Sequence, residues 1–467
     1  MSGRPSDAAE SGRATGGGCI VSGARLERWV WGRARREWSE RLAPAMRAFA
    51  DVRDLWESDL WAHEGPRVER WLASIQAGGP GEGRGPGAAG PPRFAPDPRA
   101  NCGALRFVHW NILKGIDLGG ILAWLEKDPR LARPDLLLLS EVDVGMARSG
   151  NCHVAAEIAA RLGLRWAFAP NFLELTKGPG TDALAPGENA IGLHGVAMLS
   201  RRPPFALARA ALPECFDMFA FAEKRYGGRA ALLASFPGGL VTAVAHLEVR
   251  HSPACRATQM RALLRAVDAF VAAEARAGRP VATVVLSGDW NTHTFPRGSL
   301  GGSLRGMARI VMTPGRTLER QLMEPWRSGR EPLFEELARA GYVWQPLNDR
   351  RATAFEILGN VEELGFLPGV LRWGAAKMLG LGERRIDLRL DWFAARSVAA
   401  RDHPAADAQA GPLPVAQSAP EPFSGRLAGR SPADDRSLPA PATVGRLNRA
   451  HRPSDHLPIA LDIASPL

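Results

Sequence analysis

The sequence predicts an α/β protein in which two packed β-sheets are flanked by helices. Short apolar runs rich in Val, Leu and Ala alternate with amphipathic segments from residue 104 onward. Runs of this length suit buried strands, and amphipathic segments suit helices that cover the face of a sheet. The strand-like runs outnumber the helix-like segments, and several follow one another directly. This favours two packed sheets over one doubly wound parallel sheet.

The expected elements follow from these local patterns. The predicted strands are LRFVHWNIL (105–113), DLLLLSEVD (135–143), GVAMLSRRPP (195–204), RAALLASFP (229–237), LVTAVAHLEV (240–249) and VATVVLSGDW (281–290). The predicted helices carry apolar residues at three- and four-residue steps, and the first two end at a Gly. They are CHVAAEIAARLGL (152–164), ATQMRALLRAVDAFVAAEAR (257–276) and EPLFEELARAGYVW (331–344).

An N-terminal part precedes the main domain. Residues 1–22 are polar and are expected to be disordered, whereas residues 23–76 carry Trp and Leu at helical spacing between Arg and Glu. We expect two or three amphipathic helices in this helical extension, with the tryptophan stripe as a packing surface. Residues 77–103 are rich in Gly and Pro and are interpreted as a flexible linker.

Residues 104–467 are expected to form the main domain. The full length of 467 residues exceeds what one compact domain needs, which predicts one large core with additions. A Gly/Arg-rich insertion at about 296–330 and an apolar, Gly-punctuated insertion at about 356–384 interrupt the strand pattern. The Pro/Ala-rich segment at about 400–443 is expected to be a disordered loop.

Composition limits the class of protein. The net charge of 59 − 49 = +10 favours polyanionic partners, although a GC-rich genome would produce the same excess of arginine. The five cysteines are scattered without CxxC spacing, which suggests neither a disulfide framework nor a cysteine-based zinc site. The N-terminal residues lack an apolar h-region, and no apolar run reaches about 18 residues. We therefore expect a cytoplasmic protein without a transmembrane segment.

A set of polar residues lies where apolar strands end. The set is Asn111, Glu141, His246, Asp289, Asn291, Asp391, Asp455 and His456. Each residue alone is more typical of a turn, a cap or a structural histidine. Together they predict a polar cleft at one edge of a sheet, with the carboxylate and amide oxygens that Mg²⁺ prefers. The histidines show neither HExxH spacing nor a clustered zinc arrangement.

Seven blocks in a fixed order resemble the endonuclease/exonuclease/phosphatase superfamily, which includes DNase I-like nucleases, sphingomyelinases and inositol-polyphosphate phosphatases. The blocks are WNIL, LLLSEVD, HGVAMLSR, AHLEV…R…Q, SGDWN, RLDWF and SDHLP. The resemblance covers residues 104–467 apart from the insertions. It implies a four-layered α/β sandwich with two central sheets. Further stretches are similar to a bacterial branch of the superfamily for which the resemblance implies no substrate.

The resemblance also implies a divalent-metal site at one edge of the sandwich, with Mg²⁺ as the expected ion and Mn²⁺ as its alternative. Glu141 matches the principal metal ligand, Asn111 helps to hold the ion, and Asp455 completes the metal side. The number of bound ions, one or two, is left open.

The catalytic roles are likewise carried over from the resemblance. Asp289 and Asn291 match the GDxN pair, in which the Asp orients or deprotonates water and the Asn contacts the phosphate or holds the nucleophile. His456 would pair with the scissile phosphate, Asp391 would orient its ring, and His246 matches the family's other phosphate-facing histidine. These roles suit the chemistry, because an anionic phosphodiester needs a cation, a positioned base and positive charge near the leaving oxygen.

Some positions depart from the pattern. Val196 stands where many relatives have Asn, His194 where some nucleases have Tyr, and Trp392 where Tyr is common. These changes leave the metal and water machinery intact but weaken any transfer of substrate contacts. The separation of 455 − 391 = 64 positions between Asp391 and Asp455 exceeds the loop usual in the family, and the Pro/Ala segment accounts for the excess.

The leading hypothesis is a Mg²⁺-dependent phosphodiesterase of the nuclease kind, with a phosphoester substrate and nucleic acid as a candidate partner. The +10 charge favours a nuclease, as do Arg297, Arg305, Arg309, Arg316, Arg320, Arg327 and Arg330. Against it, the 296–330 insertion lacks interleaved aromatic residues for stacking on single strands. A phosphatase for inositol phosphates or other small phosphomonoesters and a sphingomyelinase-like phospholipase are the alternatives. A non-catalytic scaffold is disfavoured because the whole catalytic set is present. The oligomeric state does not follow from the sequence.

Overall fold

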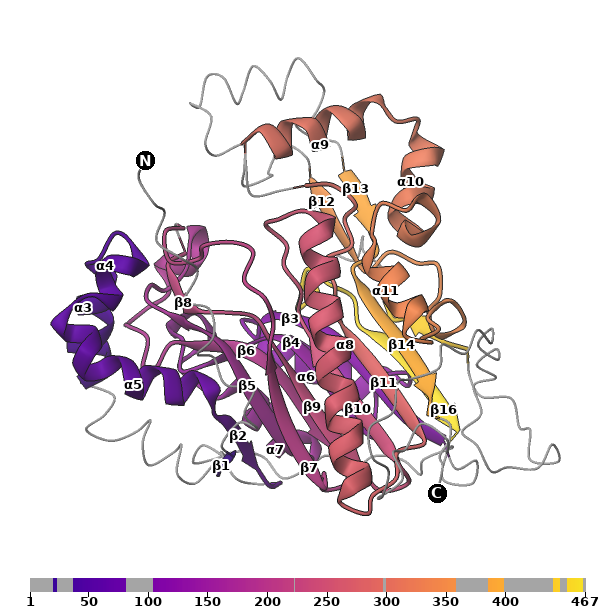
Figure 1. Ribbon diagram of the computed structural model, residues 1–467, viewed down its shortest axis with the longest axis horizontal. Helices are drawn as coiled ribbons and strands as arrows, with labels where there is room; N and C mark the ends of the chain where they lie inside the picture. The colour runs from indigo at the N-terminus through magenta and orange to yellow at the C-terminus, as the bar shows by residue number, and fades with distance from the viewer. Residues whose placement is uncertain are drawn as a thin grey trace, which may run out of the picture.

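Two β-sheets packed face to face form the centre of the protein in this computed structural model (Figure 1). The structure describes residues 20–22, 37–80, 104–221, 223–296, 300–357, 385–398, 440–445 and 452–464. The larger sheet has nine strands and the smaller has five, which confirms the predicted α/β class with two packed sheets. No helix within these ranges is long and apolar enough to cross a membrane.

The nine-stranded sheet is mixed, with β3 parallel to β4 and antiparallel to β16. Along the sheet its strands are β1 (Ile20–Ser22), β2 (Ile75–Gly78), β5 (Arg165–Glu174), β6 (Leu193–Ser200), β4 (Leu136–Val144), β3 (Ala104–Lys114), β16 (Ile459–Ala464) and β15 (Ala442–Thr443), while β8 (Arg225–Gly227) pairs with β5. The C-terminal strand therefore returns to lie beside the first strand of the main domain.

The five-stranded sheet is antiparallel except where β10 runs parallel to β11. Its strands in order are β14 (Asp391–Ser397), β11 (Thr283–Asp289), β10 (Leu240–Ala245), β9 (Ala230–Phe236) and β7 (Ala206–Ala211). The strand β14 lies at one edge and brings Asp391 opposite Asp289 in the register with β11.

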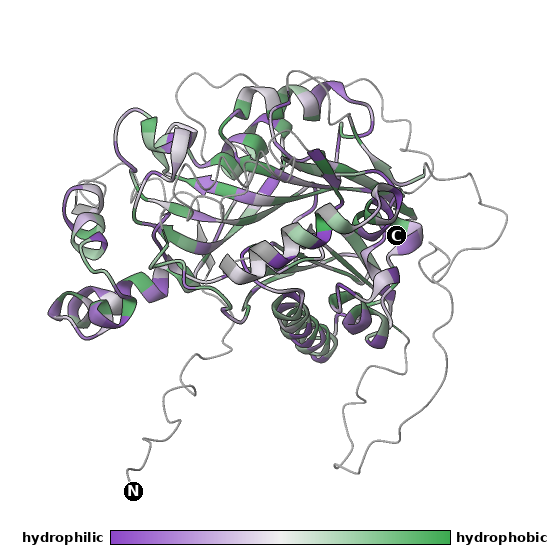
Figure 2. Ribbon diagram, turned by 90° about the horizontal axis from the view of Figure 1, so that it is seen from above, coloured by the Kyte–Doolittle hydropathy of each residue, from purple (hydrophilic) through white to green (hydrophobic). Residues whose placement is uncertain are grey.

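Strand alternation divides the apolar residues into layers. Phe107 and Leu138 of one sheet and Val244 and Val285 of the other pack in the core between the sheets. Their chain neighbours face outward and pack under helices, as period-two alternation requires. The result is a four-layered sandwich of helices, sheet, sheet and helices, with the apolar strands at the centre in Figure 2.

Helices cover both outer faces. On the nine-stranded side they are α6 (Leu118–Lys127) and α7 (Val154–Leu162), and on the five-stranded side α8 (Pro253–Arg276) and α11 (Leu333–Arg339). The helix α7 begins at His153 and ends at Gly163, which adopts the left-handed conformation that glycine tolerates. Each of the three helices predicted in the main domain is therefore present.

The N-terminal helices pack onto the larger sheet. They are a π-helix (Glu37–Leu42), α3 (Ala43–Arg47), α4 (Val52–Trp56) and α5 (Asp59–Ala73). Trp38 and Leu72 are buried in the same cluster as the outer face of this sheet, and Trp61 packs 4.7 Å from the ring of Tyr226. The strand β2 follows α5 directly and pairs with β5. Of the tryptophans that the structure describes in this segment, Trp38, Trp61 and Trp71 thus serve as a packing surface, as predicted, whereas Trp56 is exposed.

The insertions form a smaller unit at one end of the sandwich (Figure 1). It contains α9 (Leu300–Met312), α10 (Gly315–Met323) and a two-stranded sheet of β12 (Ala354–Ile357) and β13 (Arg385–Leu388), held by a small apolar cluster. The second predicted insertion lies outside the described residues apart from 356 and 357, and so does the 400–443 loop apart from 440–443.

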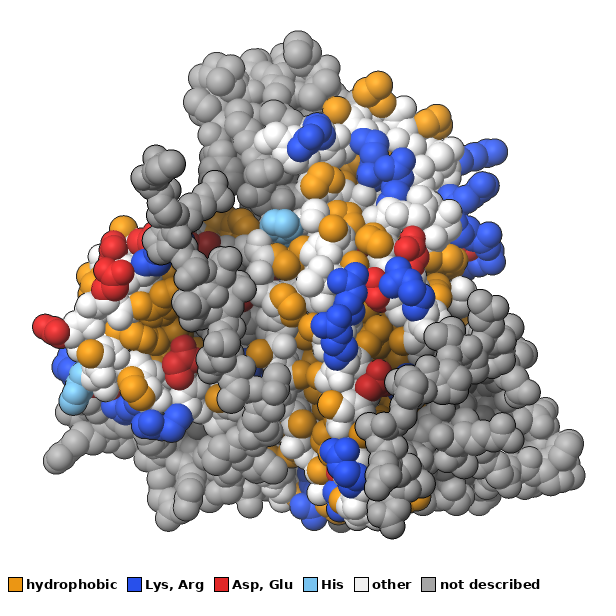
Figure 3. All heavy atoms as spheres, in the orientation of Figure 1, with side chains coloured by type: hydrophobic (Ala, Val, Ile, Leu, Met, Phe, Trp, Pro, Cys, Tyr) orange, Lys and Arg blue, Asp and Glu red, His pale blue; other side chains and the backbone are white. Residues whose placement is uncertain are grey.

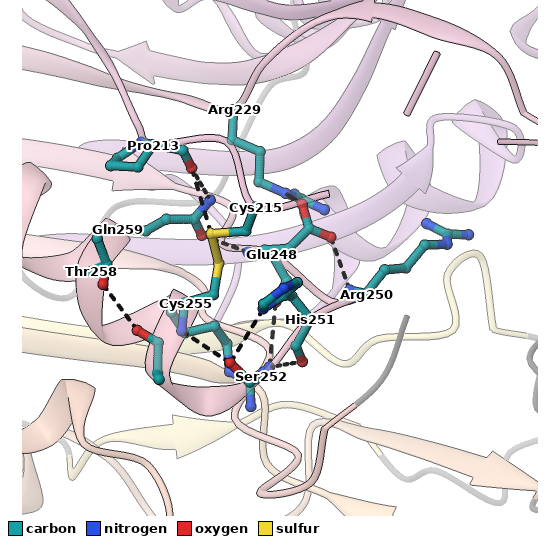
Figure 4. Close-up of a disulfide and its surroundings, with 12 residues drawn as sticks. Pro213, Cys215, Arg229, Glu248, Arg250, His251, Ser252, Cys255, Thr258 and Gln259 are labelled. Atoms are coloured by element: carbon teal, nitrogen blue, oxygen red, sulfur yellow. Dashed lines mark hydrogen bonds and ion pairs between the residues drawn. A yellow bond between two sulfur atoms is a disulfide. The ribbon is translucent and has the colours of Figure 1, made fainter. Parts of the chain in front are cut away.

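A disulfide corrects one prediction from the sequence. Cys215 follows β7, Cys255 lies in the first turn of α8, and the two are bonded with a Cα–Cα distance of 6.2 Å (Figure 4). The pair is 40 residues apart in the sequence, and spacing alone carries no signal for such a contact. Disulfides are rare in the cytoplasm, so this bond weighs against the predicted cytoplasmic location, which stays a prediction.

Breaking this disulfide is expected to lower the free energy of unfolding by about 2–4 kcal/mol, because the bond restricts the unfolded chain over a long loop. Denaturant unfolding of the wild type with and without a reductant measures the change, and Cys255→Ser should match the reduced wild type. Cys152→Ser is the control, since Cys152 is outside the bond. Equal midpoints for the oxidised wild type and Cys255→Ser would show that the bond contributes nothing.

Candidate active site

A cavity of about 350 Å³ opens at the end of the sandwich that carries β12 and β13. Six of the eight residues predicted from the sequence line it; they are Glu141, His246, Asp289, Asn291, Asp455 and His456. The other two lie directly behind the wall, Asn111 in contact with Glu141 and Asp391 in contact with His456. The structure therefore brings the whole predicted set together.

The cavity lies at one end of the core between the two sheets, where polar side chains replace the apolar ones on the inward strand faces. Along β11, Val285 packs between the sheets and Asp289 follows four residues later on the same face. The same period places His246 beyond Val244, and Asp391 two residues before Phe393. On strands of both sheets, the residues that face inward are apolar along the strand and polar at its end. The polar side chains at these strand ends therefore meet in one cavity.

A β-bulge turns Glu141 into this space. Strict alternation after Leu139, which faces outward, would also point Glu141 outward. The pairing of β4 with β6 shifts between Leu139 and Val142, and Glu141 adopts a φ of 54° in the left-handed region. Asn291 has a similar φ of 51°. Non-glycine residues in this conformation are strained, and such strain concentrates at functional sites.

A glycine allows the two catalytic strands to approach. A Cβ atom on Gly288 would lie 1.8 Å from the backbone oxygen of Ala245, a distance that no side chain can occupy. The close contact holds the ends of β10 and β11 together, so that His246 Nε2 lies 3.5 Å from Asp289 Oδ2. The Gly of the SGDWN block is therefore a packing requirement of the site.

Asp391 holds two histidines. Its Oδ2 lies 2.8 Å from His456 Nδ1, and its Oδ1 lies 3.1 Å from His109 Nε2. Burial opposes the charge on Asp391, but His456 and His109 outweigh it and hold the pKa of Asp391 well below its usual range. Burial likewise opposes the charge on His456, but Asp391 and Asp289 raise its pKa well above the ordinary value. His456 is therefore an imidazolium at neutral pH.

The SDH turn is fixed against β3. The Ser454 hydroxyl donates to the backbone oxygen of Asn111 at 2.6 Å and accepts from the backbone N–H of His456 at 3.1 Å. The Trp110 indole donates to the backbone oxygen of His456 at 3.0 Å. This C-terminal turn thus reaches the site because β16 pairs with β3.

Asp289 lies at the centre of the cluster. It accepts hydrogen bonds from Asn111 Nδ2 at 3.0 Å and from the backbone N–H of Asn291 at 3.0 Å, and His456 Nε2 lies 3.7 Å away. Burial, aided by the charge of Asp391, raises the pKa of Asp289 to about 7 despite His456 and the hydrogen bonds. Burial and Arg229 hold the pKa of His246 well below its ordinary value, so this imidazole is neutral.

The donor set fits a hard divalent cation. Glu141 and Asp455 line the cavity, and the Asn111 amide joins Glu141 to Asp289 at 3.1 Å and 3.0 Å. Burial opposes the charge on Glu141, but Lys114 and His194 outweigh it and lower its pKa, so this carboxylate is ionised. Oxygen donors of this kind suit Mg²⁺.

A second grouping, Asp289, Asp391 and His456, has ligand atoms within 4.8 Å of one another. Asp391 is already bonded to two imidazoles and His456 is positively charged, which disfavours a metal at this position. The predicted ligand set of Glu141, Asn111 and Asp455 stays a prediction, and the Asn111 oxygen accepts a hydrogen bond from the backbone N–H of Leu113 at 3.1 Å.

Several residues of the site escaped the sequence analysis. They are His109, Lys114, Asp143, Arg148, Asn171, His194, Arg225, Arg229 and Arg250. His194 lines the cavity and its Nδ1 lies 2.8 Å from Asp143, whose carboxylate accepts two hydrogen bonds from buried Arg148. Two of them carried a signal in the sequence. His109 lies two residues before Asn111 and so on the same face of β3, and His194 stands in the HGVAMLSR block, where it was noted only as a departure from the pattern.

A network beside the disulfide supports His246. Arg229 donates to the backbone oxygen of His246 at 3.1 Å. It also donates to the Glu248 carboxylate at 3.1 Å (Figure 4). Gln259 accepts from the backbone N–H of Glu248 at 2.8 Å and donates to the Pro213 oxygen at 2.9 Å. Gln259 therefore joins α8 to the segments that follow β7 and β10, and it is not among the residues that line the cavity.

The arginines of the first insertion lie elsewhere. Of those that the structure describes, none lines the cavity, and Arg309 donates to the backbone oxygen of Thr294 at 2.8 Å. On the face shown in Figure 3 the basic side chains are spread over α8 and α10 rather than gathered into one patch. Arg297 lies outside the described residues.

A known protein family and several solved structures are similar to this chain. The family model for the Endonuclease/Exonuclease/phosphatase family matches residues 108–456. Among solved structures, the chain is similar to a 3'-5' exonuclease (NExo) from Neisseria meningitidis, with 16% identity, a TM-score of 0.38, and coverage of 77% of this chain and 99% of that one. It is also similar to an AP endonuclease from Archaeoglobus fulgidus, with 16% identity, a TM-score of 0.36, and coverage of 76% of this chain and 98% of that one. A third similar structure is the human Nocturnin catalytic domain with a bound sulfate anion, with 14% identity, a TM-score of 0.36, and coverage of 77% of this chain and 92% of that one. Curated proteins give no match.

Proposed function

Because the chain belongs to the endonuclease/exonuclease/phosphatase family, it is a hydrolase of phosphoester bonds, and we propose that it cleaves phosphodiesters with Mg²⁺ and water. One observation carries this proposal. Asp289, whose pKa is raised to about 7, lies between the charged His456 and the Asn111 amide that leads to Glu141. A base (Asp289), a positively charged imidazole (His456) and a candidate metal ligand (Glu141) therefore line one cavity.

The cation-binding side consists of Glu141, Asn111 and Asp455. A Mg²⁺ ion bound there would place positive charge on the non-bridging phosphate oxygens, which otherwise repel a nucleophile. Mn²⁺, which accepts the same oxygen ligands, is the alternative ion. Glu141 is held in place for this role by the bulge and by its hydrogen bond from Asn111.

The protein groups divide the remaining work. Asp289 takes a proton from the attacking water, because a carboxylate with a pKa of about 7 is partly ionised at neutral pH and is basic enough in that form to accept the proton. Asn291 lies next to it and contacts the phosphate. The imidazolium of His456, oriented by Asp391, stabilises charge as the ester bond breaks, and neutral His246 faces the phosphate from β10.

A phosphomonoesterase is the second candidate, and the cavity itself favours it. Lys114, Arg225, Arg229 and Arg250 line a space of about 350 Å³, which is small and rich in positive charge. A dianionic terminal phosphate suits such a space. Lys114, Arg225 and Arg229 each have an acidic partner in the structure, however, which reduces the charge offered to a substrate.

A paired assay distinguishes the two candidates. With Mg²⁺, the wild type is expected to hydrolyse bis(p-nitrophenyl) phosphate faster than p-nitrophenyl phosphate. The reason is that one neutral imidazole (His246), one cationic imidazole (His456) and one base (Asp289) suit a monoanionic diester. Turnover is measured by nitrophenolate release, with EDTA as the control for metal dependence. A preference for the monoester would instead establish the phosphatase, and no turnover together with no Mg²⁺ binding would establish the scaffold.

A further inference from the structure

His194 is an imidazole of the active-site cavity to which the proposed reaction assigns no role. It lines the cavity together with Glu141, His246 and His456. It lies near the start of β6, two residues before Val196, which packs in the core between the sheets. Period-two alternation therefore directs the ring inward, into the space where the predicted catalytic residues meet.

The β-bulge that turns Glu141 inward also gives His194 its partner. After the shift in pairing between β4 and β6, Asp143 lies directly opposite His194. Without the extra residue in β4, the register of the preceding pairs would place His194 opposite Val142, whose apolar side chain offers no acceptor to the ring. One irregularity in β4 thus builds two features of the site.

The His194–Asp143 pair repeats the arrangement that orients His456. His194 Nδ1 lies 2.8 Å from Asp143 Oδ1, and the bond that holds His456 has the same length. Within the residues that the structure describes, this is the one hydrogen bond of the His194 ring, so Nε2 is left for the cavity. A buried histidine with a purely structural role usually bonds both ring nitrogens.

Asp143 is fixed from behind by Arg148. The guanidinium donates from Nε to Asp143 Oδ2 at 2.8 Å and from Nη2 to Asp143 Oδ1 at 3.0 Å. Arg148 also donates to Glu174 at 3.1 Å, and neither Arg148 nor Asp143 has more than 1% of its side chain exposed. A two-pronged bond of this kind fixes the carboxylate and, through it, the plane of the His194 ring.

His194 and His456 act on the same groups of the site. Burial opposes the charge on Glu141, but Lys114 and, more weakly, both imidazoles lower its pKa. Burial lowers the pKa of His246, and both imidazoles add to this effect. Two rings that act on the same two neighbours border the same space, which is where the reacting phosphate would lie.

We propose that His194 is a further catalytic residue, whose Nε2 donates a hydrogen bond to the reacting phosphate from the side of the nine-stranded sheet. Asp143 and Arg148 are positioning residues that act through its ring. The inference rests on the proposed phosphodiesterase function and adds a second imidazole donor to it. The non-bridging oxygens of a phosphodiester only accept hydrogen bonds, so the ring carries a proton on both nitrogens while phosphate is bound. Two imidazolium groups then share the negative charge that develops as the ester bond breaks.

The test uses two substitutions of His194. His194→Asn keeps a donor for Asp143 near the position of Nδ1 and removes Nε2, whereas His194→Ala leaves a space that added imidazole can fill. Hydrolysis of bis(p-nitrophenyl) phosphate with Mg²⁺ and the melting temperature are measured for each. His63→Asn is the matched control, because His63 is exposed on α5 and does not line the cavity.

His194→Asn is expected to lower kcat/KM about 10²- to 10³-fold, mainly through kcat, with a melting temperature close to that of the wild type. Imidazole should restore part of the activity of His194→Ala, and His63→Asn should behave as the wild type. A His194→Asn rate within about twofold of the wild type would overturn the inference. A loss that accompanies a lower melting temperature and is not rescued by imidazole would overturn it as well, because the role would then be structural.

The positioning role has a readout of its own. Asp143→Asn should lower kcat/KM in the wild-type background but have little further effect in His194→Asn, because both changes remove the same contact. Equal losses in the two backgrounds would show that Asp143 does not act through His194.

The binding of inorganic phosphate, measured by calorimetry without Mg²⁺, separates this inference from the proposed function. His194→Asn should bind phosphate about tenfold more weakly than the wild type, since a hydrogen bond to a charged group is lost. An active wild type whose rate and phosphate binding are unchanged in His194→Asn would overturn the inference and leave the phosphodiesterase standing. If the wild type hydrolysed neither nitrophenyl ester but His194→Asn still bound phosphate more weakly, the contact would stand and the proposed function would fall.

Discussion

Asp289→Asn is expected to lower kcat/KM for a phosphodiester by about 10²- to 10⁴-fold, the loss typical of a removed general base. The amide keeps the shape of the side chain but only one of the two oxygens that accept hydrogen bonds from Asn111 and Asn291, and it cannot accept a proton from water. In the wild type, kcat/KM should rise about tenfold per pH unit on the acid side. It should level off above about pH 7, where the Asp289 carboxyl is ionised. The variant should lack this acid limb.

The same substitution should stabilise the folded protein. The pKa of Asp289 is about 7 in the folded state against an ordinary value of 3.8, so the folded state binds this proton more tightly than the unfolded state. Its contribution to stability is fully present below about pH 4 and is lost as the pH rises through about 7. Asp289→Asn should therefore melt above the wild type at pH 8, measured without metal, and the gap should close toward pH 4.

The outcome that contradicts this role is specific. An Asp289→Asn enzyme with nearly full activity and an unchanged acid limb would assign the base to another group. Asp268→Asn is the matched control, since this carboxylate is half exposed, pairs with Arg396 on the surface and lies outside the cavity.

The second large effect is expected at Asp391. Asp391→Asn removes the charge that holds His456 protonated, and kcat/KM should fall about 10²- to 10³-fold, as when one charge-stabilising donor is lost. The basic limb of the pH profile should also move to lower pH, because the pKa of His456 falls without its partner. NMR titration of the His456 ring measures that pKa directly.

His109 provides the control for this prediction. His109→Gln keeps a donor toward Asp391 Oδ1 and leaves the bond from His456 Nδ1 to Oδ2 in place, so activity should stay close to that of the wild type. If Asp391→Asn retained its rate within about twofold, charge on His456 would not contribute to the reaction. Equal losses in both variants would mean that Asp391 acts through His109 instead.

The fold and most of the site were predictable because their signals are local. Each of the six predicted strands is a short apolar run, and each of Asn111, Asp289, His246 and Asp391 lies on the inward face at or near one end of a strand. The order of the blocks was informative because the family shares one topology. Sequence position alone was enough to place these residues at one end of the sandwich.

The remaining contacts depend on pairs that are distant in the chain. His109 and Asp391 are 282 residues apart, and Cys215 and Cys255 meet only because the loop after β7 reaches the start of α8. Glu141 points into the cavity because of a β-bulge, and strict period-two alternation does not predict a bulge. The contact of Arg385 with the Phe355 ring likewise requires the register of β12 and β13, which no local pattern encodes.

The most direct test of the central claim is the hydrolysis of bis(p-nitrophenyl) phosphate as a function of Mg²⁺ concentration, for the wild type and Glu141→Gln after removal of metal with EDTA. We expect no turnover by the wild type without Mg²⁺, recovery on its addition, and at least about a tenfold higher Mg²⁺ requirement for Glu141→Gln. Full activity in EDTA, or the same Mg²⁺ dependence in both proteins, would contradict a metal-assisted phosphodiesterase built on Glu141.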